Sequence, residues 1–142
     1  TCFLTLIDPE AGEVRFVNAG HVVPYVVRDA GKPELDIHAL VARGNPLGAG
    51  ANPVTRFAVR RIEPGDLLVW YTDGLVEGND TQGDQFGDRR MQRVLRRLDR
   101  TRLDPETVHD AIAGAASAHR AGRRHADDMT LVVARMRPVE AA

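Results

Sequence analysis

Two acidic positions, far apart in the sequence, carry the side chains best suited to bind a divalent cation. Asp73 ends an apolar run that follows Asp66, and Gly74 comes next, whereas Asp127 and Asp128 precede a second apolar run. A carboxylate at the end of a buried strand is held by a rigid element, and a following glycine lets the backbone turn away sharply. If the two runs are neighbouring antiparallel strands, these acids meet at one edge of a sheet.

Carboxylates gathered in this way repel one another unless a cation lies between them. Hard oxygen ligands favour Mg²⁺ or Mn²⁺ over zinc. Because successive side chains of a strand point to opposite faces, we expect only one of Asp127 and Asp128 to bind a metal directly. The simpler alternative is that Asp73 and Gly74 form an ordinary turn, and that the other acids are a solvated turn before a strand.

The elements that must position these acids are short strands in the first half of the chain and helices in the second. The run between Asp66 and Asp73 is apolar without alternation, which predicts a strand buried on both faces. Short connections between the earlier strands favour antiparallel pairing. Strands followed by helices indicate an α+β fold, with antiparallel sheet packed against helices. We expect strands at 2–7, 13–17, 24–28, 35–40, 54–62, 66–72 and 129–136.

The predicted helices are defined by apolar spacing and by their ends. Apolar residues recur at helical spacing from Met91 to Leu98. The second helix has Asp104 as its N-cap and Pro105 at its first position, with Gly122 as a stop. In the strand at 54–62, Phe57 and Val59 share one face, and Cys2 is interpreted as a core residue.

Composition limits the classes of function. The chain has 142 residues, 43% hydrophobic and 27% charged, which suits one domain. The chain has 19 basic and 20 acidic side chains, and the resulting net charge of -1 gives no general attraction to nucleic acid or to a membrane surface. A single cysteine excludes an internal disulfide, and no membrane-length run or signal peptide is visible, so we expect a cytoplasmic protein. Since Thr1 directly precedes a strand-like run, we also expect that the polypeptide was cut from a longer one.

Three other classes of phosphate-handling enzyme do not fit the sequence. A cysteine phosphatase needs an arginine six residues after its nucleophile, but that position after Cys2 is Asp8. A haloacid-dehalogenase-type enzyme needs an acid where Tyr71 stands. A P-loop needs a lysine after its glycines, and Lys32 is the only lysine.

The order of short motifs resembles the carboxy-terminal part of a PPM (PP2C-type) protein serine/threonine phosphatase, and most closely the bacterial branch typified by SpoIIE and RsbU. The resemblance spans nearly the whole chain, and we take 1–137 as this part of the domain and 138–142 as a tail. Each motif is weak alone, but their joint order is specific. They are Asn18-Ala19-Gly20-His21 with Pro24, Gly44-x-Pro46-Leu47-Gly48, Pro64-Gly65-Asp66, Tyr71-Thr72-Asp73-Gly74-Leu75-x-Glu77, Phe86-Gly87, and Asp127-Asp128-Met129-Thr130-Leu131.

The resemblance implies an α-β-β-α sandwich of two antiparallel sheets with helices outside, and a water activated by two Mn²⁺ or Mg²⁺ ions that attacks phosphoserine or phosphothreonine. It assigns Asp73 and Asp127 as metal ligands, with Asp128 in a supporting role beside Gly74. The implied substrate is a phosphorylated signalling protein, such as an anti-sigma-factor antagonist in sigma-factor regulation. A sensor domain upstream in the parent protein is a further expectation.

One departure from the family pattern is serious. The family places its other metal ligands in an amino-terminal half that this chain lacks, and Asp8 does not match them. We therefore expect the parent protein to be, or to descend from, a phosphatase, and residues 1–142 alone to be inactive. The alternative is a catalytically inactive PPM-like regulatory or binding module.

Other polar residues have two interpretations each. His21 either lies near the phosphate or is a loop residue satisfied by backbone groups. Glu77, with the polar loop to Gly83, either gates the site or forms an ordinary surface loop. The arginines of the first predicted helix either dock an acidic partner or form a solvated face. They are Arg89, Arg93, Arg96, Arg97 and Arg100.

Overall fold

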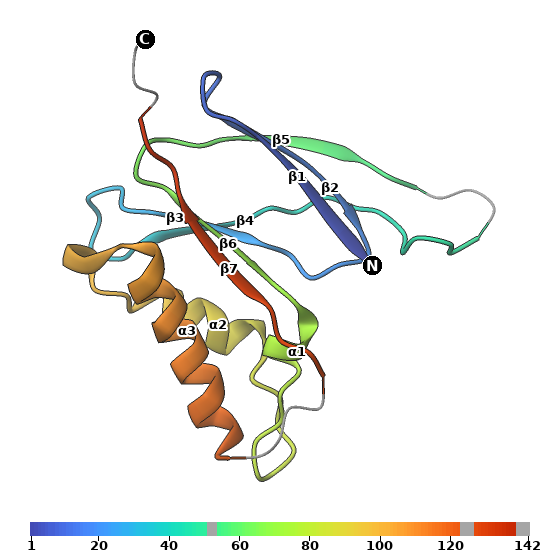
Figure 1. The fold of residues 1–142 in the computed structure, drawn as a ribbon, viewed down its shortest axis with the longest axis vertical. Helices are drawn as coiled ribbons and strands as arrows, with labels where there is room; N and C mark the ends of the chain where they lie inside the picture. The colour runs from blue at the N-terminus through green and yellow to red at the C-terminus, as the bar shows by residue number, and fades with distance from the viewer. Residues whose placement is uncertain (51–53, 123–126, 139–142) are drawn as a thin grey trace.

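A computed structural model describes residues 1–50, 54–122 and 127–138, and these form two antiparallel sheets with helices against the second (Figure 1). The first sheet has the order β1-β2-β5, with β1 at Cys2–Asp8, β2 at Glu13–Ala19 and β5 at Phe57–Arg61. The second has the order β4-β3-β6-β7, with β3 at Tyr25–Arg28, β4 at Asp36–Ala39, β6 at Leu67–Tyr71 and β7 at Leu131–Arg135. The helices are α1 (Asp73–Val76), α2 (Gly87–Arg96) and α3 (Pro105–Arg120), with a 3₁₀ turn at Arg100–Arg102. The predicted α+β class is confirmed.

One layer of the core lies between the two sheets. Val14 and Phe16 of β2 pack with Val26 of β3 and Leu68 of β6, and all four are buried. Trp70 of β6 packs against the same cluster. Its indole Nε1 donates a hydrogen bond to Thr5 Oγ1 at 3.1 Å, which links β6 to β1 across the layer. The sheets are therefore joined by apolar contact and by one polar link.

A second core layer lies between the second sheet and the helices. Leu67 and Val69 of β6 face Met91 and Leu95 of α2, together with the buried stripe of α3. That stripe is Val108, Ile112 and Ala116. Because Leu68 points to the other layer, β6 is buried on both faces, as its unbroken apolar run predicted.

The predicted start of α3 is confirmed. Asp104 Oδ1 accepts a hydrogen bond from Thr107 N at 2.9 Å, and Pro105 is the first helical residue. Ala121, one residue before the predicted stop, takes the left-handed conformation that ends the helix.

A buried carboxylate fixes the start of β6. Asp66 is 2% exposed and accepts hydrogen bonds from Arg28 Nε at 2.8 Å and Arg28 Nη2 at 2.7 Å. The backbone N–H of Glu63 donates to the same carboxylate at 2.9 Å. Asp66 thus ties β3, β6 and the turn before β6 together.

The outer face of the first sheet is apolar and exposed. Leu4, Leu6 and Phe57 are each more than 60% exposed, and Val59 is 49% exposed. One expectation is corrected here, because Cys2 is exposed rather than part of the core. The face that Phe57 and Val59 share is the uncovered one. The reason is alternation: the side chains of β1 that turn inward are Phe3 and Thr5, which leaves Cys2, Leu4 and Leu6 outside.

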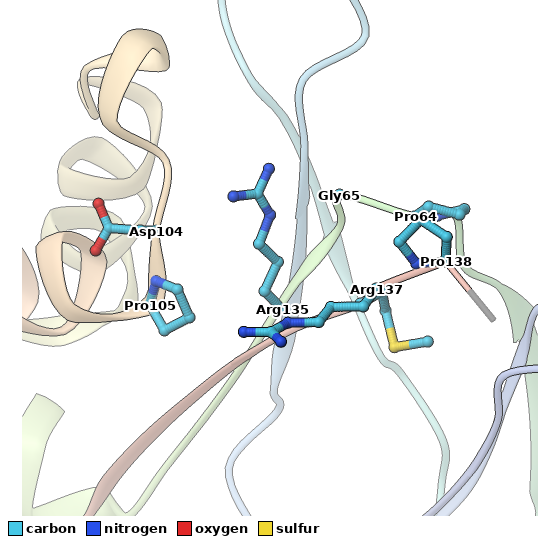
Figure 2. A pocket seen from close by; sticks show the side chains of 8 residues that line it. Pro64, Gly65, Asp104, Pro105, Arg135, Arg137 and Pro138 are labelled. Atoms are coloured by element: carbon cyan, nitrogen blue, oxygen red, sulfur yellow. The ribbon is translucent and has the colours of Figure 1, made fainter. Parts of the chain in front are cut away.

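A hollow of about 580 Å³ lies between the start of α3, the turn before β6 and the end of β7, and Figure 2 shows the side chains that line it. Asp104 and Pro105 lie on one side of it, and Pro64, Gly65 and Arg135 on the other. These strand ends are opposite to those that carry Asp73 and Asp127, so this hollow is separate from the candidate site.

None of the helices in the described part of the chain combines the length and the apolar character that crossing a bilayer requires. Of the predicted tail, only Pro138 lies within the described residues.

Candidate metal-binding site

The pairing of β6 with β7 brings the two acidic positions to one edge of the second sheet. The strands are antiparallel, with Tyr71 opposite Leu131. Thr72 extends the ladder, because its N–H donates to Thr130 O at 3.0 Å. Its hydroxyl accepts from Thr130 N at 2.9 Å and donates to Asp128 O at 3.2 Å. The end of β6 and the start of β7 are thus fastened just before Asp73 and just after Asp127.

Gly74 lies directly against the backbone of the second acidic position. A Cβ atom at Gly74 would be 2.5 Å from Asp128 O and 3.4 Å from Asp127 O. Such distances leave no room for a side chain, so the glycine lets α1 approach the start of β7. The chain then continues from Asp73 into the short helix α1, before the polar loop that follows Glu77.

Both carboxylates are oriented by the next residue of the chain. Asp73 Oδ1 accepts from Gly74 N at 3.0 Å, and Asp127 Oδ1 accepts from Asp128 N at 2.8 Å. Within the described residues, the second oxygen of each carboxylate accepts no hydrogen bond. Asp73 is half-buried, whereas Asp127 and Asp128 are exposed. As far as the described residues go, one oxygen of each acid is left for water or a cation.

The type of ligand atom suits Mg²⁺ or Mn²⁺, since both ions bind carboxylate oxygens. The number of ligands is small, however. Among residues 1–50, 54–122 and 127–138, no group of three or more His, Cys, Asp or Glu side chains gathers closely enough to hold a metal ion. These residues thus supply part of a ligand set.

Glu77 and His21 have different surroundings. Glu77 is exposed one turn after Asp73, and its N–H donates to Asp73 O at 2.8 Å, which closes α1. His21 N–H donates to Asn18 Oδ1 at 2.7 Å, and its ring Nδ1 lies 3.1 Å from Thr1 Oγ1. Within the described residues, no hydrogen bond joins His21 to Asp73 or Asp127. His21 therefore has the surroundings of a loop residue satisfied by its neighbours.

The two early motifs that contain His21 and Pro46 pack on each other. A Cβ atom at Gly44 would lie 1.8 Å from Asn18 O. Asn18 is 5% exposed, and its Nδ2 donates to His21 O at 2.9 Å. The glycine of one motif thus makes room for the backbone of the other.

The roles of two residues of the site region were not predicted from the sequence. Thr72 fastens both strands through its hydroxyl, as described above. Arg120 is 6% exposed at the end of α3, where its Nη1 lies 3.6 Å from Met129 Sδ and its Cδ would lie 3.3 Å from a Cβ at Gly78. It therefore contacts the segments that follow both acids. Its position four residues after Ala116 continues the buried stripe of α3, a signal that could have identified it.

Tyr71 connects the site edge to α2. Its hydroxyl donates to Asp88 Oδ1 at 3.1 Å, and its ring stacks on Tyr25 with centroids 6.1 Å apart. Burial raises the pKa of Tyr71 above its usual value, and the neighbouring Tyr25 and Asp88 raise it further. The phenol therefore stays a neutral donor and holds the end of β6 against the helix layer.

Replacing Gly74 with alanine is expected to lower the free energy of unfolding by about 1–3 kcal/mol, because the added methyl group overlaps Asp128 O. Urea denaturation measures this change. Gly114→Ala in α3 is the matched control, since a Cβ there meets no atom within 4 Å, and it should raise stability by about 0.5–1 kcal/mol. Equal stability of wild type and Gly74→Ala would contradict the close contact.

Residues 1–137 match the family model of Stage II sporulation protein E (SpoIIE), and the chain therefore belongs to that family. It is a family of PP2C-type phosphatase domains, and the two sheets with flanking helices have the PP2C fold.

Relatives and solved structures agree with this membership. Protein IcfG from Synechocystis sp. is 26% identical over 132 residues, which cover 93% of this chain and 20% of IcfG. The phosphatase domain of the cell fate determinant SpoIIE from Bacillus subtilis, presoaked with Mn, superposes with a TM-score of 0.71 at 21% identity, covering 99% of this chain and 58% of that one. The SiaA-PP2C domain of Pseudomonas aeruginosa gives a TM-score of 0.73 at 24% identity, covering 94% and 50%. This chain thus spans a fifth of its curated relative and 50–58% of these two solved chains.

Proposed function

We propose that residues 1–137 are the carboxy-terminal part of a metal-dependent protein serine/threonine phosphatase domain, in which Asp73 and Asp127 bind divalent cations. The observation that carries the proposal is the contact of Gly74 with the backbone of Asp128, since it brings two acid-bearing segments together at one sheet edge. Membership of the SpoIIE family supports the reaction class.

Each residue near the edge has a role in this proposal. Asp73 and Asp127 each offer the oxygen that takes no backbone hydrogen bond, and Asp128 acts through its N–H, which orients the Asp127 carboxylate. Thr72 holds the two strand ends in register. The bound Mn²⁺ or Mg²⁺ would supply an activated water and would neutralise phosphoryl oxygens. The Mn presoak of a related SpoIIE domain is consistent with this choice of metal.

The proposed substrate is a phosphorylated protein of a cytoplasmic signalling circuit, with an anti-sigma-factor antagonist as the first candidate by analogy with SpoIIE and RsbU. This analogy is at the level of the family, because fold alone does not define a substrate. His21 and Glu77 are given no part in metal binding.

A second candidate function is that of an inactive regulatory or binding module with the same fold. It is favoured by the small ligand set, because two carboxylates bind Mg²⁺ weakly when the ion keeps most of its waters. The ligands that would complete the site must then come from outside the described residues, or be absent from the protein altogether.

Phosphopeptide hydrolysis with Mn²⁺ separates these functions. The experiment compares residues 1–142 with the natural chain extended on its amino-terminal side. We expect turnover by the extended chain and none by residues 1–142. Turnover by neither would favour the inactive module, and robust turnover by residues 1–142 would overturn the assignment of these residues as half of a site.

A further inference from the structure

The exposed side of α2 and the residue after it carry arginines whose side chains contact no hydrogen-bonding or charged partner among the described residues. Arg89, Arg93, Arg96 and Arg97 are all exposed, and none of them makes a hydrogen bond or ion pair with another described residue. Three other arginines have partners: Arg28 binds Asp66, Arg90 donates to Gln85 O, and Arg100 binds Asp29. The side chains of Arg56, Arg60 and Arg61 likewise make no hydrogen bond or ion pair with another described residue, but Arg89, Arg93, Arg96 and Arg97 are four such arginines that line a single hollow at α2.

These four side chains surround a hollow. It measures about 390 Å³ and is completed by Gln92 and Glu34. Gln92 Nε2 donates to Tyr25 OH at 3.2 Å, so the middle of the hollow is anchored to the second sheet. Arg100 binds Asp29 and the backbone oxygen of Lys32, which ties the turn before Glu34 to the segment after α2. The helix and the turn that border the hollow are thus tied to the second sheet and to each other.

We infer that this hollow, the arginine hollow, is a docking surface for an acidic segment of a partner protein. The inference is independent of the phosphatase proposal. Arg89, Arg93 and Arg97 follow one another at intervals of four residues, about 6 Å along a helix axis. Alternate residues of an extended peptide are about 7 Å apart, so carboxylates at every second position match this spacing. Guanidinium groups bind carboxylates through paired N–H donors, which suits such a ligand.

Other polyanions fit less well. Single-stranded nucleic acid binds on stacking aromatic side chains, and no aromatic residue lines the arginine hollow. Glu34 also repels a continuous phosphate backbone. Membrane binding requires apolar side chains that enter the bilayer beside the cations, and the lining has none. A discrete acidic peptide can avoid Glu34 while it reaches the arginines.

The probe is a fluorescent peptide of about eight residues with glutamate at every second position, compared with the same peptide carrying glutamine. Fluorescence anisotropy measures its binding to the protein. We expect only the glutamate peptide to bind, and its affinity to fall between about 0.05 M and 0.3 M salt, because screening weakens exposed charge pairs. The double variant Arg93→Gln, Arg96→Gln should lower the affinity about fivefold or more at low salt.

The matched control is Arg56→Gln with Arg61→Gln, which makes the same change of net charge at exposed positions outside the hollow. This control should bind the peptide like the wild type, and Glu34→Gln should bind about twofold more tightly. Three results would overturn the inference: no difference between the glutamate and glutamine peptides, an equal loss in both double variants, or unchanged or weaker binding by Glu34→Gln. A single-stranded oligonucleotide that binds more tightly than the peptide, with the same loss in Arg93→Gln, Arg96→Gln, would assign the surface to nucleic acid instead.

Discussion

Replacing Asp73 with asparagine in the amino-terminally extended chain is expected to lower kcat for phosphopeptide hydrolysis at least about 100-fold, because an amide is a much weaker ligand for Mg²⁺ or Mn²⁺ than a carboxylate. The fold should survive. Asparagine keeps an oxygen that accepts from Gly74 N, and the Thr72 links do not involve the side chain of residue 73. Steady-state kinetics at several Mn²⁺ concentrations measure the loss, and circular dichroism checks the fold.

Asp110→Asn is the matched control for this variant. It makes the same chemical change at an exposed position on α3, where the partner among the described residues is the neighbouring His109. Its kcat should equal that of the wild type. Asp127→Asn should resemble Asp73→Asn. Wild-type kcat in a folded Asp73→Asn protein would refute the assignment of Asp73 as a metal ligand.

Replacing Asp66 with alanine is expected to lower the free energy of unfolding by about 3 kcal/mol, because it leaves a partly buried guanidinium without its main partner. Asp66 is 2% exposed, and it accepts two hydrogen bonds from Arg28 and one from Glu63 N. The Arg28 side chain is 22% exposed, so water offsets part of the loss and the effect lies at the lower end for a broken buried pair.

Glu63 provides a control on the same arginine. Arg28 lies 2.7 Å from Glu63 Oε1 and 2.7 Å from Asp66 Oδ2, but the Glu63 side chain is 64% exposed. Glu63→Gln should therefore cost less than about 1 kcal/mol, as exposed ion pairs do. Urea denaturation of both variants measures the difference. Equal losses would mean that burial does not decide the strength of this pair.

The features that the sequence predicted are those that follow from periodicity and from local turn chemistry. The strand buried on both faces follows from an unbroken apolar run, and the start of α3 follows from Asp104 and Pro105. The sequence predicted that the two acidic positions meet only if β6 and β7 are neighbouring antiparallel strands. The register of Tyr71 with Leu131 confirms that they are. The roles of Asp73 and Asp127 as metal ligands stay a prediction.

Other features could not be predicted from periodicity or from local turn chemistry. Alternation shows that Phe57 and Val59 share a face, but it does not show which face another layer covers. The exposed outer side of the first sheet could therefore not be assigned from the sequence, and the interpretation of Cys2 as a core residue was wrong. The hydroxyl of Thr72 acts through contacts between distant segments, and such contacts leave no periodic trace in the sequence. Arg120 was also missed, although its spacing from Ala116 continues the buried stripe of α3.

The fluorescence of the single tryptophan reports on the contact between the two sheets. Trp70 lies between the two sheets and donates to Thr5, whereas both tyrosines, Tyr25 and Tyr71, belong to the layer beneath the helices. Its emission will shift to longer wavelength when the sheets part and water reaches the indole, even while the helices stay packed. Fluorescence excited at the red edge of indole absorption will thus measure the rate at which the two sheets separate, independently of the layer between the second sheet and the helices.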